Sequence, residues 1–174
     1  MEEAIAKAVE ACQRGSLEAL EAALQEGVVP NACDVDGCSL LHWAAINNRI
    51  PVVQRLLELG ANPNVVGGLL VSSPLHWAAR VGHVSSSALL IKAGAVCNVR
   101  DTQGYTPIHL AVQSNQPTLV AYLLEKFDYC KDITDNSGIE LLLGDADVSL
   151  RNKQQETPLD IARNMRNQKL VGNI

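Results

Sequence analysis

A chain of 174 residues with a net charge of −5 and 47% hydrophobic residues has the composition of an ordinary globular protein. Its 14 basic residues are scattered, which argues against the basic stripe that nucleic-acid-binding proteins present. No apolar run approaches the roughly 20 residues of a membrane-spanning helix. We therefore expect no nucleic-acid partner and no membrane contact by this chain.

The N-terminus and the cysteines bear on the compartment. Met1-Glu2-Glu3 is acidic, unlike the start of a secretory signal peptide, so we expect the chain to fold in the cytosol. An odd number of cysteines at irregular spacing favours reduced, structural thiols over disulfides or metal ligands. These are Cys12, Cys33, Cys38, Cys97 and Cys130. No metal and no cofactor is expected.

Local signals predict four pairs of helices in chain order. Residues 1–35 form an N-terminal capping unit with helices over 3–13 and 16–26. Residues 36–66 form a repeat with helices over 40–48 and 51–59, residues 67–99 a repeat with helices over 74–81 and 84–92, and residues 100–133 a repeat with helices over 107–114 and 117–126. Glycine follows three of the outer helices and is expected there in the left-handed conformation, at Gly27, Gly60 and Gly94.

One short motif recurs through the chain, and its histidine returns after 34 and then 33 residues. The copies are Leu40-Leu41-His42-Trp43-Ala44-Ala45, Pro74-Leu75-His76-Trp77-Ala78-Ala79, Thr106-Pro107-Ile108-His109-Leu110-Ala111 and Thr157-Pro158-Leu159-Asp160-Ile161-Ala162. This motif at this period resembles the ankyrin repeat. The resemblance implies an all-α ankyrin-repeat solenoid of stacked helix-turn-helix units with β-turn fingers, in a single domain over 1–174.

The period breaks after the fourth unit. Thr106 and Thr157 are 51 residues apart, which fits neither one further repeat nor two. We interpret 134–156 as an incomplete repeat or a gap, and 157–174 as the start of a terminal repeat.

The polar residues of the motif are expected to support the fold. His42, His76 and His109 would tie turn backbone together between adjacent units, and no nucleophile or orienting acid accompanies them. We therefore predict no catalytic residue and no enzyme activity in this chain. In many ankyrin proteins, asparaginyl hydroxylases act at the position of Asn31, Asn64 and Asn98. We favour the interpretation that each of these side chains bonds its own turn backbone.

Function is then expected on the concave surface of turns and inner helices. Trp43 and Trp77 take a position where Leu110 suffices in the next unit, so each is either an anchor for a partner or core packing between units. A lengthened apolar turn, 66–74, precedes Trp77 and suggests a pocket wall. Arg80 and Tyr105 occupy positions that the fold leaves free, and they are further candidate peptide-binding residues.

A closer resemblance rests on Leu40 to Ile50, Gly67-Gly68, Ser73 to Ala78 and Val120 to Leu123. These segments resemble the N-terminal domain of ankyrin-bearing DHHC protein S-palmitoyltransferases of the huntingtin-interacting-protein type. The resemblance implies a cytosolic, monomeric module that recruits substrate proteins through short Gln-Pro segments, read by Asn47 and Trp77. It also implies a parent protein anchored in the Golgi or another endomembrane. The alternative is a general cytosolic ankyrin adaptor unrelated to lipid transfer.

Overall fold

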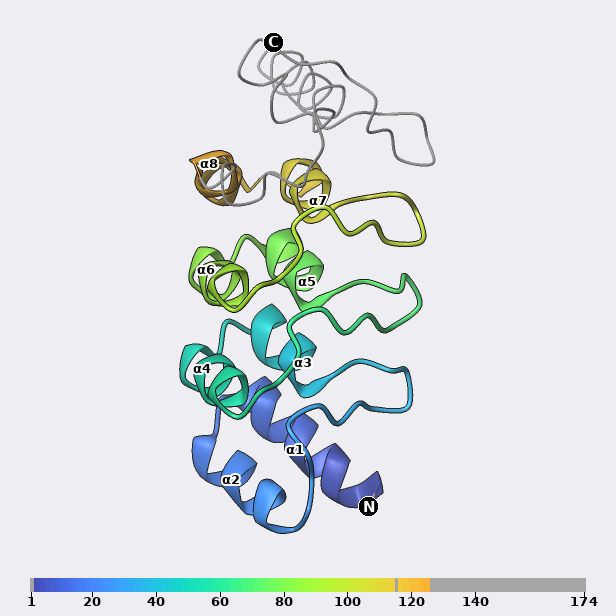
Figure 1. The fold of residues 1–174 in the computed structure, drawn as a ribbon, viewed down its shortest axis with the longest axis vertical. Helices are drawn as coiled ribbons and strands as arrows, with labels where there is room; N and C mark the ends of the chain where they lie inside the picture. Colours follow the sequence, from blue (N-terminus) through green and yellow to red (C-terminus); the bar gives the residue numbers. More distant parts are fainter. Residues whose placement is uncertain (1, 115, 126–174) are drawn as a thin grey trace, which may run out of the picture. The chain divides into compact units, whose positions relative to one another are not determined.

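The computed structural model describes residues 2–114 and 116–125 of the chain. These residues form eight α-helices and two isolated β-bridges, and they contain no extended strand. Figure 1 shows the helices in consecutive pairs joined by short loops. The helices are α1 (Glu2–Arg14), α2 (Leu17–Gln25), α3 (Leu40–Ile46), α4 (Ile50–Glu58), α5 (Pro74–Val81), α6 (Val84–Lys92), α7 (Pro107–Gln113) and α8 (Pro117–Glu125).

The predicted helix pairs are confirmed, with ends that differ by at most two residues. The largest difference is at α3, which ends at Ile46 rather than 48. Asn47 caps the helix, and Asn48 adopts φ 52°, a left-handed conformation that a helix cannot continue through. The glycines expected after the outer helices have positive φ, 97° at Gly27, 82° at Gly60 and 91° at Gly94.

The histidine of the motif lies in the first turn of three inner helices, where it caps the N-terminus. In α3 the backbone N–H of Ser39 donates to His42 Nδ1 at 3.0 Å, the exchange that a capping box usually makes with Glu or Gln. Because Nδ1 accepts this proton, Nε2 carries the ring hydrogen and donates to the Ser72 carbonyl at 2.8 Å. The same pairing with the preceding Ser or Thr recurs at Ser73–His76 and Thr106–His109. At His42 the expected role of tying turns together is confirmed.

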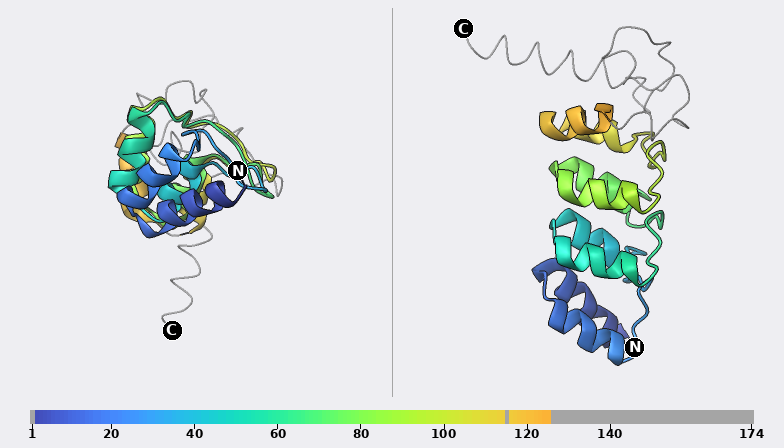
Figure 2. Two further views of the ribbon diagram at one scale, coloured as in Figure 1. Left: turned by 90° about the horizontal axis from the view of Figure 1, so that it is seen from below. Right: turned by 60° about the vertical axis from the view of Figure 1, so that its left-hand side comes forward.

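The chain divides into two compact units, Met1–Ala78 with His83–Val96, and Ala79–Gly82 with Cys97–Ile174. In the first unit, α1 packs against α2 and α3, and α4 packs against α2, α3 and α6 (Figure 2). Its core is built from leucines that are fully buried, Leu20, Leu40, Leu41, Leu56, Leu75 and Leu90. These leucines keep the two Leu-His-Trp-Ala-Ala motifs in fixed positions.

Two loops of the first unit, which we call the first finger (residues 31–39) and the second finger (residues 64–72), project side by side (Figure 1). Each closes on itself through one β-bridge, Cys33 with Ser39 and Gly67 with Ser72. The fingers are joined by a hydrogen bond from the Gly68 N–H to the Asp36 carbonyl, 2.9 Å long. Their backbones therefore approach closely at this point.

Asn31 and Asn64 connect each finger to the turn that follows it. Asn31 Oδ1 accepts from the Asn62 N–H at 2.7 Å, and Asn64 Oδ1 accepts from the Val96 N–H at 2.8 Å. The interpretation that these side chains bond their own turns is therefore wrong about the partner. The bonds span about one repeat, because equivalent positions in stacked units lie above one another.

In the second unit α7 packs against α8, and the turn before α7 is held by Asp101. Asp101 Oδ1 accepts from the backbone N–H groups of Gln103 at 2.8 Å and Tyr105 at 2.9 Å. Cys97 is disulfide-bonded, so the expectation that every cysteine is reduced is wrong for this residue. Cys12, Cys33 and Cys38 are free thiols.

Three of the sequence predictions fall on the C-terminal part of the chain. The incomplete repeat at 134–156, the terminal repeat at 157–174 and Cys130 lie outside the described residues. The assignment of 1–174 to one domain stays a prediction.

Candidate functional site

Trp43 is held by the first finger. Its indole Nε1–H donates to Asp34 Oδ2 at 2.8 Å. The other oxygen of Asp34 accepts from the Asp36 N–H at 3.0 Å and the Cys38 N–H at 2.9 Å, so this carboxylate also shapes the finger. The bond between a finger and an inner helix fixes the orientation of the half-buried indole.

Trp77 completes a cluster of three rings. It meets Trp43 edge-on, with centroids 5.2 Å apart and planes at 89°, and His42 at 5.1 Å and 71°. Such T-shaped contacts contribute about 0.5–1.5 kcal/mol beyond the buried area. Trp77 is half-buried, and within the part of the chain that the structure describes its Nε1–H has no hydrogen-bond partner. The indole therefore packs on one side and keeps an unused donor.

Asn47 lies at the C-terminus of α3, one turn after Trp43. One N–H of its carboxamide donates to the Trp43 carbonyl at 2.9 Å. Among the described residues the Oδ1 atom and the second N–H have no partner. The side chain is thus oriented by the helix end and keeps one acceptor and one donor for another amide.

The second finger stands against Trp77, as the lengthened turn 66–74 suggested. A Cβ at Gly68 would lie 3.6 Å from the Trp77 ring and 3.3 Å from Cys38 Sγ. Beyond Gly68 the finger exposes aliphatic side chains, with Leu69 98% accessible. Val71 adopts φ 50°, a left-handed conformation that is unfavourable for a β-branched residue. The finger therefore places exposed apolar groups next to the indole.

Arg80 and Tyr105 belong to the second unit. Arg80 is exposed in the last turn of α5. Tyr105 is 4% accessible, packs edge-on against His109 at 6.0 Å, and its hydroxyl accepts from Gln113 Nε2 at 3.4 Å. The structure thus brings Asn47, Trp43 and Trp77 together. The expectation that the fold leaves Tyr105 free is wrong, because its side chain is buried. A binding role for Arg80 and Tyr105 stays a prediction.

Sequence reasoning missed Asp34 as the partner of Trp43. The two residues are nine positions apart in the sequence, and this spacing could have suggested the pair. The unit 100–133 has an aspartate at the same spacing from its inner helix. There Asp101 precedes Leu110 by the same spacing, and its Oδ2 atom is buried with no hydrogen-bond partner in the described part of the chain. Nine residues before Trp77 stands Gly68, which has no side chain to accept a bond. Only Trp43, of the two indoles, is anchored in this way.

Removing the Trp43 donor is expected to cost stability. Trp43→Phe keeps an aromatic ring but leaves Asp34 Oδ2 without its indole, which we expect to lower the free energy of unfolding by about 1–2 kcal/mol. Urea denaturation followed by circular dichroism measures this. Trp77→Phe is the matched control, because that indole donates no bond, and we expect a smaller loss. Equal losses in both variants would contradict the role given to Asp34.

Burial shifts the pKa values of His42 and Cys38 in this region toward their uncharged forms. Burial lowers the pKa of His42 to about 4, against smaller opposing effects of its bond to Ser72 and the charge of Asp34. Burial, with Asp34, Asp36 and Cys33 adding to it, raises the pKa of Cys38 to about 11. A neutral imidazole and protonated thiols are poor starting points for nucleophilic chemistry. Residues 2–114 and 116–125 contain no group of three or more His, Cys, Asp or Glu placed to hold a metal ion.

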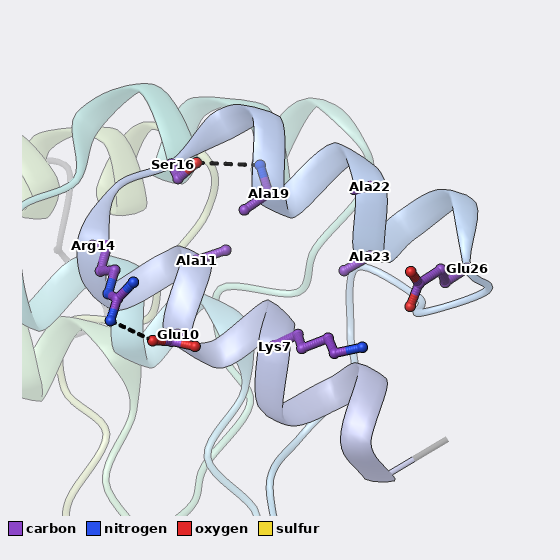
Figure 3. Close-up of a pocket in the computed structure, with 9 residues that line it drawn as sticks. All are labelled: Lys7, Glu10, Ala11, Arg14, Ser16, Ala19, Ala22, Ala23 and Glu26. Carbon is purple, nitrogen blue, oxygen red and sulfur yellow. Dashed lines mark hydrogen bonds and ion pairs between the residues drawn. The ribbon is translucent and has the colours of Figure 1, made fainter.

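A groove of about 320 Å³ lies on the capping unit between α1 and α2 (Figure 3). Its floor is formed by Ala11, Ala19, Ala22 and Ala23. Lys7, Glu10, Arg14 and Glu26 surround it, with Arg14 paired to Glu10 at 2.6 Å. It shares no residue with the Trp43 and Trp77 cluster.

Several curated proteins are similar to this chain. It is 39% identical over 141 residues to palmitoyltransferase AKR1 of Lachancea kluyveri. The aligned region covers 76% of this chain and 19% of the relative. It is 42% identical to palmitoyltransferase Hip14 of Drosophila melanogaster, over 59% of this chain and 16% of the relative. It is also 42% identical to palmitoyltransferase ZDHHC13 of Homo sapiens, over 59% of this chain and 17% of the relative. The chain thus spans less than a fifth of the length of these relatives.

None of the helices in the described residues is long and apolar enough to span a membrane. The family model for ankyrin repeats in three copies matches residues 8–66 and 70–137, which is more than half of the chain. The helix pairs, the paired fingers and the His42 bond between turns agree with that match. The chain belongs to the ankyrin-repeat family.

Proposed function

We propose that the chain is the substrate-recruiting module of a protein S-palmitoyltransferase. Its likeness to three proteins named as palmitoyltransferases supports the assignment, and their greater length leaves room for a catalytic domain outside residues 1–174. In this proposal the chain itself transfers no acyl group. It faces the cytosol as a monomeric module, and the parent protein is anchored in the Golgi or another endomembrane.

The observation that carries the proposal is the arrangement of Asn47 with Trp43 and Trp77. Asn47 keeps one acceptor and one donor, which can pair with both polar atoms of a glutamine carboxamide. Trp77 is half-buried beside Trp43, and an indole face accepts a proline ring by apolar contact. A Gln-Pro dipeptide in an extended segment matches these two groups.

The energetics favour selectivity for glutamine. A glutamine that is desolvated without a partner costs about 1–3 kcal/mol, whereas glutamine opposite Asn47 recovers its hydrogen bonds. Trp77 is held in place by Trp43, and Trp43 by Asp34, so little side-chain entropy is lost when the peptide binds.

Calorimetric titration of a peptide containing Gln-Pro tests the proposal. Asn47→Ala and Trp77→Ala are each expected to weaken binding by at least about 2 kcal/mol, roughly thirty-fold. Changing the peptide to Glu-Pro or Gln-Ala should cause comparable losses without altering the protein.

The matched control is Gln54→Ala, which removes an exposed carboxamide from α4 and should leave the affinity unchanged. Circular dichroism checks that each variant is folded. If all the proteins bind the Gln-Pro peptide with the same affinity, Asn47 and Trp77 do not form the site. A folded partner that binds while the peptide does not would favour the general adaptor instead.

A further inference from the structure

A second groove, of about 420 Å³, lies between α1 and the first finger. Its apolar walls are Ile5, Ala6 and Val9 from the helix, and Cys33 and Val35 from the finger. Figure 2 shows the N-terminal end of α1 on the side from which the fingers project. The volume falls within the range of about 300–1,000 Å³ typical of ligand pockets.

The groove exposes apolar surface that the described fold does not cover. Val35 is 94% accessible at the tip of the finger, and Ile5 and Val9 are only half-buried. A valine with that exposure adds nothing to the stability of the monomer, since burial is what stabilises an apolar side chain. Covering it with a partner's aliphatic group would bury apolar area on both sides.

The two charged residues that line the groove are both acidic. Glu2 and Asp34 line it, and Asp36 follows in the same finger. None of the three forms an ion pair within the described residues. The basic residues of α1 are engaged elsewhere, Lys7 with Glu3 at 3.3 Å and Arg14 with Glu10 at 2.6 Å. Asp34 also adds to the effect of burial in raising the pKa of the Cys33 thiol, as a negative local potential would.

We propose that this groove binds a protein segment in which aliphatic side chains are flanked by lysine or arginine. The aliphatic side chains fill the space between Val9 and Val35, and the flanking cations face Glu2 and Asp36. An anionic membrane surface or an acidic segment would be repelled by the same carboxylates. This groove shares Asp34 with the support of Trp43, but Asn47, Trp43 and Trp77 do not line it. Its occupation does not depend on a Gln-Pro sequence.

The test uses the full chain and a synthetic peptide, acetyl-Gly-Lys-Ile-Ile-Lys-Gly-amide, titrated by calorimetry. We expect saturable binding that weakens when the salt concentration is raised to about 0.5 M, because screening removes the charge term. Replacing both lysines by glutamate, or both isoleucines by serine, should weaken binding at least about ten-fold. Absence of saturable binding, or equal binding of the glutamate peptide, would overturn the proposal.

Variants locate the surface. Val35→Ser is expected to weaken binding of the lysine peptide at least about ten-fold, because it removes apolar area from the wall without changing the charge of the groove. Val29→Ser is the matched control, since Val29 is also exposed, at 59%, but does not line the groove. Asn47→Ala should leave this peptide unaffected, so that failure here and failure of the Gln-Pro site are separate results. Equal effects of the two valine variants would place the binding elsewhere and overturn the proposal.

Discussion

Replacing Gly67 by alanine is expected to destabilise the first unit by about 3 kcal/mol. A Cβ at this position would overlap the Gly37 carbonyl oxygen, and it would stand 2.5 Å from the Gly37 carbonyl carbon and 2.8 Å from the Cys38 nitrogen. All three are backbone atoms, which cannot move away as a flexible side chain can. The fingers must separate, and the bond from Gly68 to Asp36 would be lost with them. Urea denaturation followed by circular dichroism measures the loss.

Gly60→Ala separates this clash from the general cost of replacing a glycine. Gly60 has φ 82°, but a Cβ there would have no neighbour within 4 Å, so we expect a cost of about 1–2 kcal/mol from the left-handed backbone alone. The Gly67 variant should also weaken Gln-Pro binding, because Gly68 stands next to Trp77. If both alanine variants were equally stable, the fingers would not be in the close contact described.

Acidification is expected to destabilise the chain through His42. The ring is fully buried and burial lowers its pKa to about 4, whereas a histidine in the unfolded chain titrates near 6.5. Between these values the unfolded state binds more protons, so stability is complete above pH 6.5 and is lost as the pH falls toward 4. The loss at pH 5 is about 2 kcal/mol relative to neutral pH.

Two measurements check this. Urea denaturation at pH 7.5 and pH 5 should show a smaller pH dependence in His42→Asn than in the unaltered chain, by roughly the same 2 kcal/mol. A proton NMR titration of the His42 ring should show a midpoint near 4. A midpoint near 6.5 would mean that the imidazole can be protonated inside the fold, contrary to its bonds with Ser39 and Ser72.

Most of the fold could be predicted from the sequence because its determinants are local. The period of the motif, the glycines after the outer helices and the Ser or Thr before α3, α5 and α7 fix the elements within a few residues. The role of His42 could be predicted as well, since its partners belong to the repeating backbone. The end of α3 was misplaced because nothing in the sequence distinguishes a helical Asn48 from a left-handed one.

The contacts that could not be predicted join residues whose proximity depends on the stacking of units. Asn31 bonds a turn 31 residues away, and Gly67 touches Gly37 across two fingers. The anchoring of Trp43 by Asp34 is an exception, since a comparison with Asp101 and Leu110 in the sequence could have suggested it. The groove beside Val35 depends on how α1 is tilted against the finger, and no residue pattern encodes that tilt.

The edge-on contact between Trp43 and Trp77 has a spectroscopic consequence. The sequence contains two tryptophans, and both belong to the candidate site. Indole emission excited at the red edge of absorption therefore reports on this site alone, without an added label. Centroids 5.2 Å apart also allow the two transitions to couple, so the near-ultraviolet dichroism should carry a signature of the pair. A ligand that stacks on Trp77 would change both the indole emission and the near-ultraviolet dichroism.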